Sequence, residues 1–143
     1  MLATVVLVDG TGDLLMSAAR SLRRRHAARL ARWDVTPGQA RALRLVVGAD
    51  APIRLSGLAE QLGIVPRSAT EVVDALEARG LVVRRPDPGD RRAIGVVATD
   101  EGQRLAVLME EARAAEADAY LSALPAEDRA ELNRILQKLV AEG

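Results

Sequence analysis

The sequence contains no cysteine and no phenylalanine, and only one histidine, one tryptophan and one tyrosine. A chain without cysteine has no disulfide framework and cannot sense oxidants through a thiol. A single histidine without cysteine also leaves no set of side chains suited to a zinc site. The composition therefore excludes a disulfide-stapled protein and a thiol-based sensor, and we expect no bound metal.

Sequence signatures of catalysis are missing as well. The chain has no glycine fingerprint of a dinucleotide site or a phosphate-binding loop, and its DGTG cluster at residues 9–12 is not followed by a lysine. The lone histidine does not lie near a candidate nucleophile, and no pair of carboxylates is framed by an apolar pattern. We therefore predict a binding protein without a cofactor rather than an enzyme.

Long hydrophobic runs are also absent. The apolar start MLATVVLV breaks at Asp9 and follows no basic residue, so it is too short for a membrane span and unlike a signal peptide. We expect a cytoplasmic protein with no membrane partner. Residues 1–12 fit a short strand, an arm on a partner chain, a helix extension or a partly ordered tail, and the tail is the favoured interpretation.

The formal net charge is zero, but the charge is unevenly distributed along the chain. Residues 1–100 contain 15 arginines and 11 acidic residues, and residues 101–143 contain 5 basic and 9 acidic residues, so the two parts carry +4 and −4. A basic front with an acidic rear suits a protein that presents one face to phosphate. The length of 143 residues fits a single domain, residues 1–143.

The most informative stretch is Arg54–Thr99, which predicts two short helices joined by a turn. Ser56 is a good N-cap for the first helix, and Gly63 ends it. Pro66 suits the first position of the second helix, and Gly80 ends that helix. Four apolar residues of the second helix recur at core spacing: Ala69, Val72, Val73 and Leu76.

A β-hairpin is predicted after the second helix. The β-branched runs LVVRR and AIGVVA flank PDPGDRR, whose proline, aspartate and glycine favour a turn. Arg91 and Arg92 are therefore expected in an exposed loop, where Asp90 can brace a guanidinium that enters a narrow minor groove. A short strand at Ile53–Leu55 is expected to complete a three-stranded sheet.

Long amphipathic helices are predicted on both sides of this stretch. One spans residues 13–33, and the next begins with a capping box formed by Thr36 and Gln39, with Pro37 at its first position. The core-facing residues expected in that second helix are Ala40, Leu43, Val46 and Val47. Thr99 caps another long helix that continues to Pro125, and a last helix follows with one apolar side: Leu132, Ile135, Leu136, Leu139 and Val140.

Several of these segments resemble the MarR family of dimeric transcriptional regulators. The similar segments are LAEQLGI, RSATEVVDALEARGLVVRRPDPGDRRA and ATDEG. The residues that match the family pattern are Asp74, Leu76, Glu77, Gly80, Leu81, Asp90, Arg92, Thr99 and Gly102. The chain departs from the pattern at Ala98, where the family usually has leucine, and at Val65, where a polar cap often begins the recognition helix.

The resemblance implies a mainly α fold. Residues 36–99 would form a winged helix-turn-helix with a small three-stranded sheet, and residues 13–33 would join 100–143 in a helical dimerisation part. Two copies would bury apolar stripes that otherwise stay exposed. The alternative is a three-helix cap within one chain. The implied function is a sequence-specific regulator, favoured as a repressor, that binds a pseudo-palindromic DNA duplex as a homodimer.

The helix-turn-helix and the hairpin supply the candidate DNA-binding residues. Arg67 can bind a guanine edge or a phosphate, and the hydroxyls of Ser68 and Thr70 suit base or phosphate contacts. Glu71 can accept a hydrogen bond from cytosine or orient Arg67, and its alternative is an ordinary solvated side chain. Strand alternation turns one of the neighbouring Arg84 and Arg85 outward. The predicted DNA-binding set is Ser56, Arg67, Ser68, Thr70, Glu71, Arg85, Asp90, Arg91 and Arg92.

The resemblance further implies a crevice where a small-molecule effector releases the DNA. Candidate lining residues are His26, Trp33 and Arg41, which fit packing or surface roles equally well. With so few aromatic residues, the lining would be mostly aliphatic. A winged-helix adaptor that binds protein is the alternative class, but it has no need for arginines at both the helix start and the hairpin tip.

Overall fold

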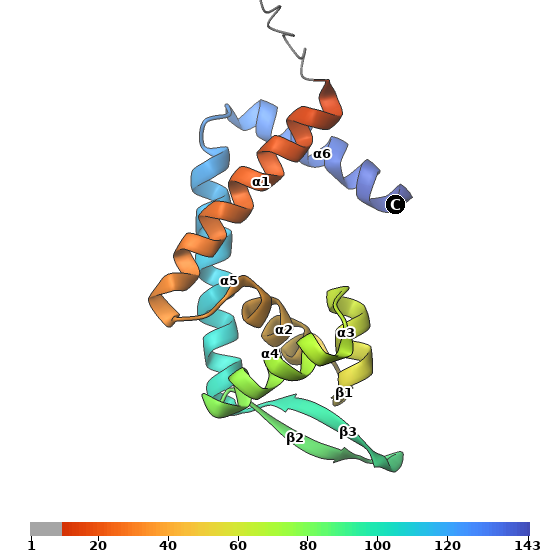
Figure 1. Cartoon of the computed structure of the whole chain (residues 1–143). Helices are drawn as coiled ribbons and strands as arrows, with labels where there is room; N and C mark the ends of the chain where they lie inside the picture. Colours follow the sequence, from red (N-terminus) through yellow and green to blue (C-terminus); the bar gives the residue numbers. More distant parts are fainter. Residues whose placement is uncertain (1–9) are drawn as a thin grey trace, which may run out of the picture. The chain divides into compact units, whose positions relative to one another are not determined.

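The computed structural model describes residues 10–143 and is mainly helical, which confirms the predicted fold class (Figure 1). The prediction for the start of the chain falls largely on residues 1–9, which lie outside the described residues. The elements follow in the order α1 Thr11–Leu30, a 3₁₀ turn Ala31–Trp33, α2 Pro37–Gly48, β1 Ile53–Arg54, α3 Leu55–Leu62, α4 Pro66–Ala78, β2 Val82–Asp87, β3 Asp90–Ala98, α5 Asp100–Leu121 and α6 Ala126–Glu142.

The contacts group the described residues into two compact units. One unit, here called the reading unit, comprises residues 27–112, and the other comprises residues 10–26 with 113–143. The reading unit extends beyond the predicted limits of 36 and 99 because the end of α1 and the start of α5 contribute Leu30 and Leu105 to its core. The proposed division at residues 36 and 99 stays a prediction.

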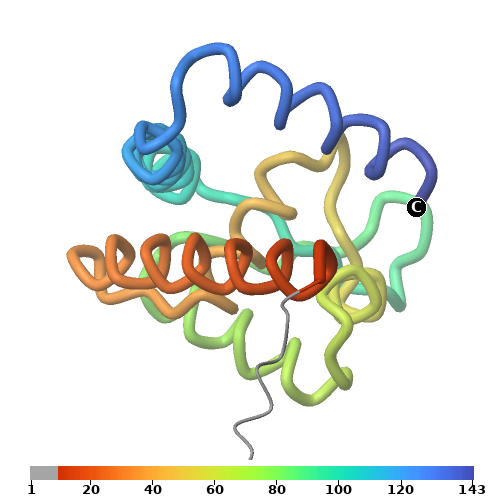
Figure 2. Tube along the Cα trace, turned by 90° about the horizontal axis from the view of Figure 1, so that it is seen from above, coloured from red at the N-terminus to blue at the C-terminus, as the bar shows by residue number. Residues whose placement is uncertain are grey.

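In the second unit, α1 and α5 are joined by a partly buried ion pair. Nη1 of Arg25 lies 3.1 Å from Oε1 of the buried Glu116, and the Arg25 guanidinium lies 5.0 Å from the centre of the Tyr120 ring. Figure 2 looks along α5 and shows the chain turning sharply into α6. On the predicted apolar side of α6, Leu132 and Leu136 are half-buried in the single chain. The other three residues are exposed: Ile135 at 42%, Leu139 at 53% and Val140 at 80%.

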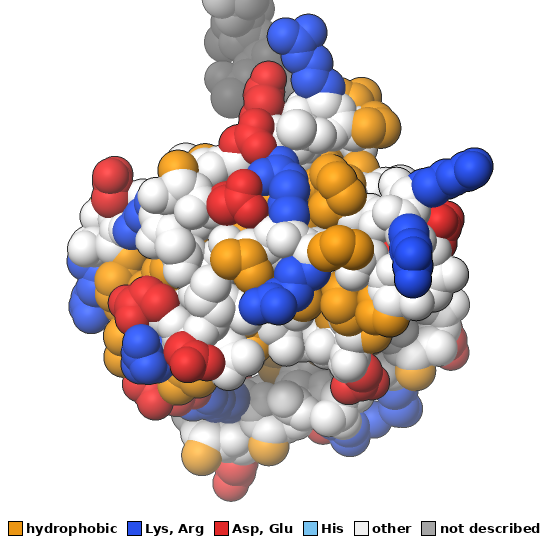
Figure 3. All heavy atoms as spheres, turned by 90° about the horizontal axis from the view of Figure 1, so that it is seen from below, with side chains coloured by type: hydrophobic (Ala, Val, Ile, Leu, Met, Phe, Trp, Pro, Cys, Tyr) orange, Lys and Arg blue, Asp and Glu red, His pale blue; other side chains and the backbone are white. Residues whose placement is uncertain are grey.

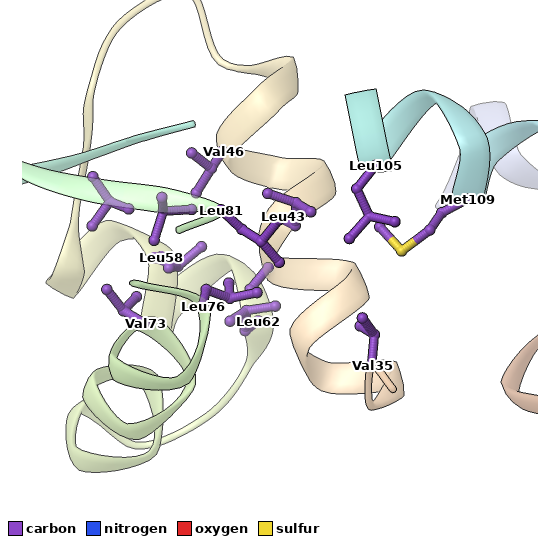
Figure 4. Packing of buried hydrophobic residues seen from close by; sticks show 13 residues of the cluster. Val35, Leu43, Val46, Leu58, Leu62, Val73, Leu76, Leu81, Leu105 and Met109 are labelled. Carbon is purple, nitrogen blue, oxygen red and sulfur yellow. The ribbon is translucent and has the colours of Figure 1, made fainter. Parts of the chain in front are cut away.

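The core of the reading unit forms where α2, α3 and α4 meet the sheet. Leu43, Leu58 and Val73 are fully buried, one from each helix. Leu105 and Met109 reach from α5 toward α2 and close the cluster (Figure 4). Burying a large aliphatic side chain contributes about 1.5–3 kcal/mol, so this cluster fixes how the three helices are oriented.

The predicted helix boundaries are mostly confirmed by local hydrogen bonds and dihedral angles. The Thr36 hydroxyl accepts a hydrogen bond from the Gln39 backbone N–H at 3.1 Å, and the Gln39 side chain accepts one from the Thr36 N–H at 3.2 Å. α4 begins at Pro66. Gly63 and Gly80 have φ angles of 66° and 70°, which glycine adopts without steric cost.

Three predictions about individual positions are wrong. Ser56 is not an N-cap: Arg54 has the extended backbone of the cap, Leu55 begins α3, and β1 therefore ends at Arg54 rather than Leu55. Val47 is 36% exposed, whereas Ala42 is fully buried, because the buried face of α2 is rotated toward Ala42.

The sheet has the strand order β1–β3–β2 and is antiparallel throughout, so the predicted three-stranded sheet is confirmed. Ile53 pairs with Val96, and Val82 pairs with Ala98. The predicted loop is too long: β2 continues to Asp87 and β3 begins at Asp90, which leaves Pro88 and Gly89 as the turn. Arg91 and Arg92 therefore lie on a strand and not in the loop.

Within residues 10–143, no helix is long and apolar enough to cross a bilayer. The same residues contain no cluster of three or more acidic or histidine side chains that can hold a metal ion.

Candidate nucleic-acid interface

The first two turns of α4 present a polar surface that begins at an exposed helix end. The Arg67 side chain is 91% exposed and the Glu71 side chain 69% exposed, and Nε of Arg67 lies 3.7 Å from Oε1 of Glu71. This separation at i and i+4 is an ion pair without a hydrogen bond, so Glu71 can orient Arg67 and still release it. The geometry fits the predicted orienting role of Glu71.

The Thr70 hydroxyl is already committed within α4. It donates a hydrogen bond to the carbonyl oxygen of Pro66 at 3.1 Å. A hydroxyl has one hydrogen to donate, so in this arrangement Thr70 can only accept a further hydrogen bond. Phosphate oxygens are acceptors, and the structure therefore favours a base contact over a phosphate contact for Thr70. Ser68 is half-buried, which leaves it partly accessible.

Arg84 ties the wing strand β2 to the recognition helix α4. Its guanidinium donates to Oδ1 of Asp74 at 2.6 Å and to Oε1 of Glu77 at 2.7 Å, and its backbone N–H donates to Oε2 of Glu77 at 3.0 Å. Burial of Arg84 lowers its pKa, but the hydrogen bonds to the two carboxylates outweigh burial, so its pKa lies above the ordinary value. Three bonds between two elements hold α4 and the wing as one rigid piece.

A second ion pair holds the far end of β2. Nε of Arg54, the N-cap residue of α3, donates to Oδ2 of Asp87 at 2.7 Å, and Oδ1 of Asp87 accepts the Gly89 N–H at 2.8 Å. The hydrogen bond from Arg54 is the main cause that lowers the pKa of Asp87, and the same bond raises the pKa of Arg54. Asp87 therefore fastens the hairpin turn to the start of α3.

The lowered pKa of Asp87 predicts a pH-dependent contribution to stability. A carboxyl group with a depressed folded pKa stabilises the fold above its unfolded pKa of about 4, and this stabilisation disappears as the pH falls through the folded value. We expect Asp87→Asn to melt below the wild type at neutral pH and to converge with it in acid. Thermal denaturation between neutral and strongly acidic pH measures this, with Asp50→Asn as the control that removes an exposed carboxylate from the same unit. A difference that is constant with pH contradicts the tie.

The wing displays three exposed arginines near its turn: Arg85, Arg91 and Arg92. Alternation along β2 directs Arg84 to α4 and leaves Arg85 outward, as predicted. Asp90 does not brace a guanidinium: its Oδ1 accepts the backbone N–H of Arg92 at 3.0 Å and so fixes the start of β3. The pairing of β2 with β3 is irregular here, because Pro86 pairs with Ile94 and the next residue, Asp87, pairs with Asp90. Arg91 and Arg92 therefore lie in a bulged stretch of β3, and both are exposed.

Ion pairs occupy three acidic side chains of α4 and β2. The acidic side chains of Asp74, Glu77 and Asp87 are all bound by Arg84 or Arg54. Figure 3, seen from the side of the wing, shows Lys and Arg side chains among hydrophobic and acidic ones on this face. The exposed arginines of α4 and the wing can therefore attract phosphate without first breaking these pairs.

The structure places the remaining predicted residues in more ordinary positions. Ser56 is exposed in the first turn of α3. Arg41 donates to the carbonyl oxygens of Gln61 at 3.2 Å and Leu62 at 3.3 Å, so it binds the C-terminal end of α3. Trp33 is half-buried and packs against the core, and its ring lies 4.9 Å from the Arg32 guanidinium.

His26 is half-buried and belongs to the unit that does not contain Trp33 and Arg41.

Sequence reasoning missed the residues that position the interface. Arg79, at the end of α4, donates to the carbonyl oxygens of Trp33 at 2.7 Å and Asp34 at 2.9 Å. The hydrogen bonds made by Arg54, Arg79 and Asp87 each join residues that are more than 30 positions apart in the sequence. Asp34 has a left-handed backbone with φ 53°. Aspartate tolerates this conformation better than most residues, so the residue type at position 34 is the one sign in the sequence of a turn that Arg79 can bind.

A family model, described as the MarR family, matches residues 33–93, which cover α2 to the start of β3. This segment contains every residue of the interface on α3, α4 and β2. Among curated proteins, none matches the chain at a significant level.

Solved structures match over nearly the whole chain. Wild-type MarR from E. coli in its apo form is 24% identical with a TM-score of 0.81, and the match covers 91% of this chain and 96% of that one. CouR from Rhodococcus jostii RHA1, bound to p-coumaroyl-CoA, is 28% identical with a TM-score of 0.75, covering 92% of each chain. A MarR-family transcriptional regulator from Rhodococcus sp. RHA1 is 27% identical with a TM-score of 0.77, covering 95% and 96%.

Proposed function

We propose that this chain, whose winged-helix segment matches the MarR family model, represses transcription by binding a specific DNA duplex. The observation that supports this most is the joint display, within the reading unit, of exposed Arg67 at the start of α4 and exposed Arg91 and Arg92 on the wing. In a winged helix-turn-helix, the second helix enters the major groove. An arginine-bearing wing suits the adjacent minor groove.

The proposal includes a homodimer. The unit formed by residues 10–26 and 113–143 leaves large apolar side chains exposed on both terminal helices, including Leu14, Met16, Ile135 and Leu139. Exposed stripes of this kind are characteristic of surfaces that a second copy covers. Two copies related by a two-fold axis would present two α4 helices to successive major grooves, roughly 10 base pairs apart.

A gel shift with the duplex upstream of the chain's own gene tests the proposed function. We expect a discrete complex that survives an excess of unrelated DNA. Specific binding by regulators of this kind exceeds their non-specific binding by about a thousandfold or more. A chain that binds the upstream duplex and unrelated DNA equally well, or binds neither, contradicts the proposal, and the second result favours the protein-binding adaptor.

Substitutions in α4 are expected to change which bases are preferred. Arg67→Ala should remove the preference for one guanine per half-site, because a bidentate arginine contact discriminates against other bases by about 1–3 kcal/mol. Glu71→Gln should relax the same position, since Arg67 then loses its orienting charge at 3.7 Å. Duplexes selected from a randomised pool by wild type and variants measure both effects. An unchanged base profile refutes the two roles.

The release of DNA by a small-molecule effector stays a prediction. Its support is the likeness to CouR, which was crystallised with p-coumaroyl-CoA. An effector acts only through different affinities for two conformations of the regulator. Of the predicted lining residues, Arg41 is the weakest candidate because its guanidinium is bound to the end of α3.

A further inference from the structure

Val65 is the most exposed large apolar residue of the helix-turn-helix and wing. Within residues 53–98, all of which the structure describes, two large apolar side chains are exposed: Val65 at 64% and Ile94 at 49%. Val65 immediately precedes Pro66, the first residue of α4. Its isopropyl group therefore stands at the end of the helix that is proposed to enter the major groove.

The Val65 side chain has no structural role in the fold. Val65 occupies the N-cap of α4, but its side chain makes no capping hydrogen bond. Serine, threonine, aspartate and asparagine supply such a bond at this position, and valine cannot. The apolar contact that often precedes a helix is made by Ile64, which is half-buried against the core cluster. Only the backbone carbonyl of Val65 is used, as the acceptor for Ser68 and Ala69.

The chemistry of the major groove selects one contact for an exposed isopropyl group. Among the base edges in that groove, the 5-methyl group of thymine is the apolar feature, and apolar side chains recognise it. The highly exposed Arg67, two residues after Val65, can form the polar base contacts at this end of α4. The Thr70 hydroxyl already donates its hydrogen to the Pro66 carbonyl. Ile94 lies on the wing strand β3, which is proposed to approach the minor groove, where no methyl group is displayed.

We infer that Val65 reads the 5-methyl group of a thymine in each half-site, so that the tip of α4 adds an apolar contact to the polar contacts of Arg67. This inference rests on the proposed function. The inference names the base that is recognised, thymine, and the group of that base that is contacted, its 5-methyl group. The other base contacts predicted for this site are hydrogen bonds. The contact excludes water from two apolar groups and should contribute about as much as one buried methylene group.

The test removes the methyl group from the DNA rather than from the protein. A duplex selected by the full chain from a randomised pool is synthesised with each thymine replaced in turn by deoxyuridine. For the wild type, one such replacement in a half-site should weaken binding about fourfold, and the symmetric pair about 16-fold. In Val65→Ser the same replacements should change binding less than about twofold.

Val65→Ser should remain folded, because serine supplies the missing N-cap of α4, and its melting temperature should not fall below that of the wild type. Val47→Ala is the matched control: it trims an exposed valine on α2 and should leave the deoxyuridine effect intact. The inference is overturned if no deoxyuridine weakens wild-type binding, if Val65→Ser stays as sensitive as the wild type, or if selected half-sites lack thymine. Failure to select any duplex overturns the proposed function as well, and so differs from failure of the inference alone.

Discussion

Gly102→Ala is expected to destabilise the protein by about 3 kcal/mol or more and to lower its melting temperature by about 10 °C. Gly102 is buried in the first turn of α5, and a Cβ atom there would overlap the carbonyl oxygen of Leu81 and lie 3.0 Å from its carbonyl carbon. That oxygen accepts the Thr99 N–H at 3.1 Å, so the backbone cannot move aside without losing the bond. Thermal denaturation at matched protein concentration measures the loss.

The control for this prediction is Gly57→Ala. Gly57 lies in α3, and the atom nearest to a Cβ added there would be Cγ2 of Ile53, at an ordinary van der Waals distance of 3.9 Å. Alanine is a better helix former than glycine by about 1 kcal/mol, so this variant should be as stable as the wild type or slightly more stable. Equal destabilisation of both variants would contradict the steric explanation at Gly102.

Replacing Arg92 by alanine is expected to weaken DNA binding about a hundredfold, with nearly the same factor for every duplex sequence. A hydrogen bond to a charged group contributes about 1.5–3 kcal/mol, and the proposed homodimer would lose two such bonds, one from each chain, so a hundredfold loss is the lower end of the expected range. Because Arg92 is expected to bind the DNA backbone or a minor groove, base preference should change little. The slope of log affinity against log salt should also become shallower by about one for each phosphate that the variant no longer neutralises.

Arg91 is the matched comparison for Arg92, because both are exposed in the same bulged stretch of β3. The backbone N–H of Arg92 is held by Asp90 at 3.0 Å, and Arg92 matches the family pattern, so Arg91→Ala should have a smaller effect than Arg92→Ala. Arg104→Ala is the control for charge alone. It removes one exposed arginine at the start of α5, which lies at the other end of the nine-residue β3, about 30 Å from the wing turn. Equal losses of affinity for the Arg92 and Arg104 variants would show that only net charge matters.

Local chemistry explains which parts of the fold the sequence predicts. Pro66, Gly63, Gly80 and the Thr36 capping box act within a few residues, so each helix end that depends on them is readable from the chain. The turn of the wing was predicted too long because the prolines, aspartates and glycine of PDPGDRR are poor strand formers by themselves. Pairing across the hairpin overrides that preference and extends both strands.

The interface was predicted only in part for a related reason. The exposure of Arg67 follows from helical periodicity. The exposure of Arg91 and Arg92 was predicted from a loop, whereas both residues lie on β3. The bonds that orient α4 and the wing are made between residues distant in sequence, such as Arg54 with Asp87, and periodicity gives no sign of them. Ser56 was assigned a capping role because serine favours that position, but the start of α3 is set by the pairing of Arg54 with Gly95 in the sheet.

Selection of duplexes from a randomised pool by the full chain, followed by determination of the protein-to-DNA ratio, tests the central claim most directly. That claim is that two reading units, each with its own α4 and wing, bind one duplex. We predict enrichment of a pseudo-palindrome whose half-sites lie about 10 base pairs apart, bound by two chains. Enrichment of an asymmetric sequence bound by one chain, or no enrichment at all, would contradict the account.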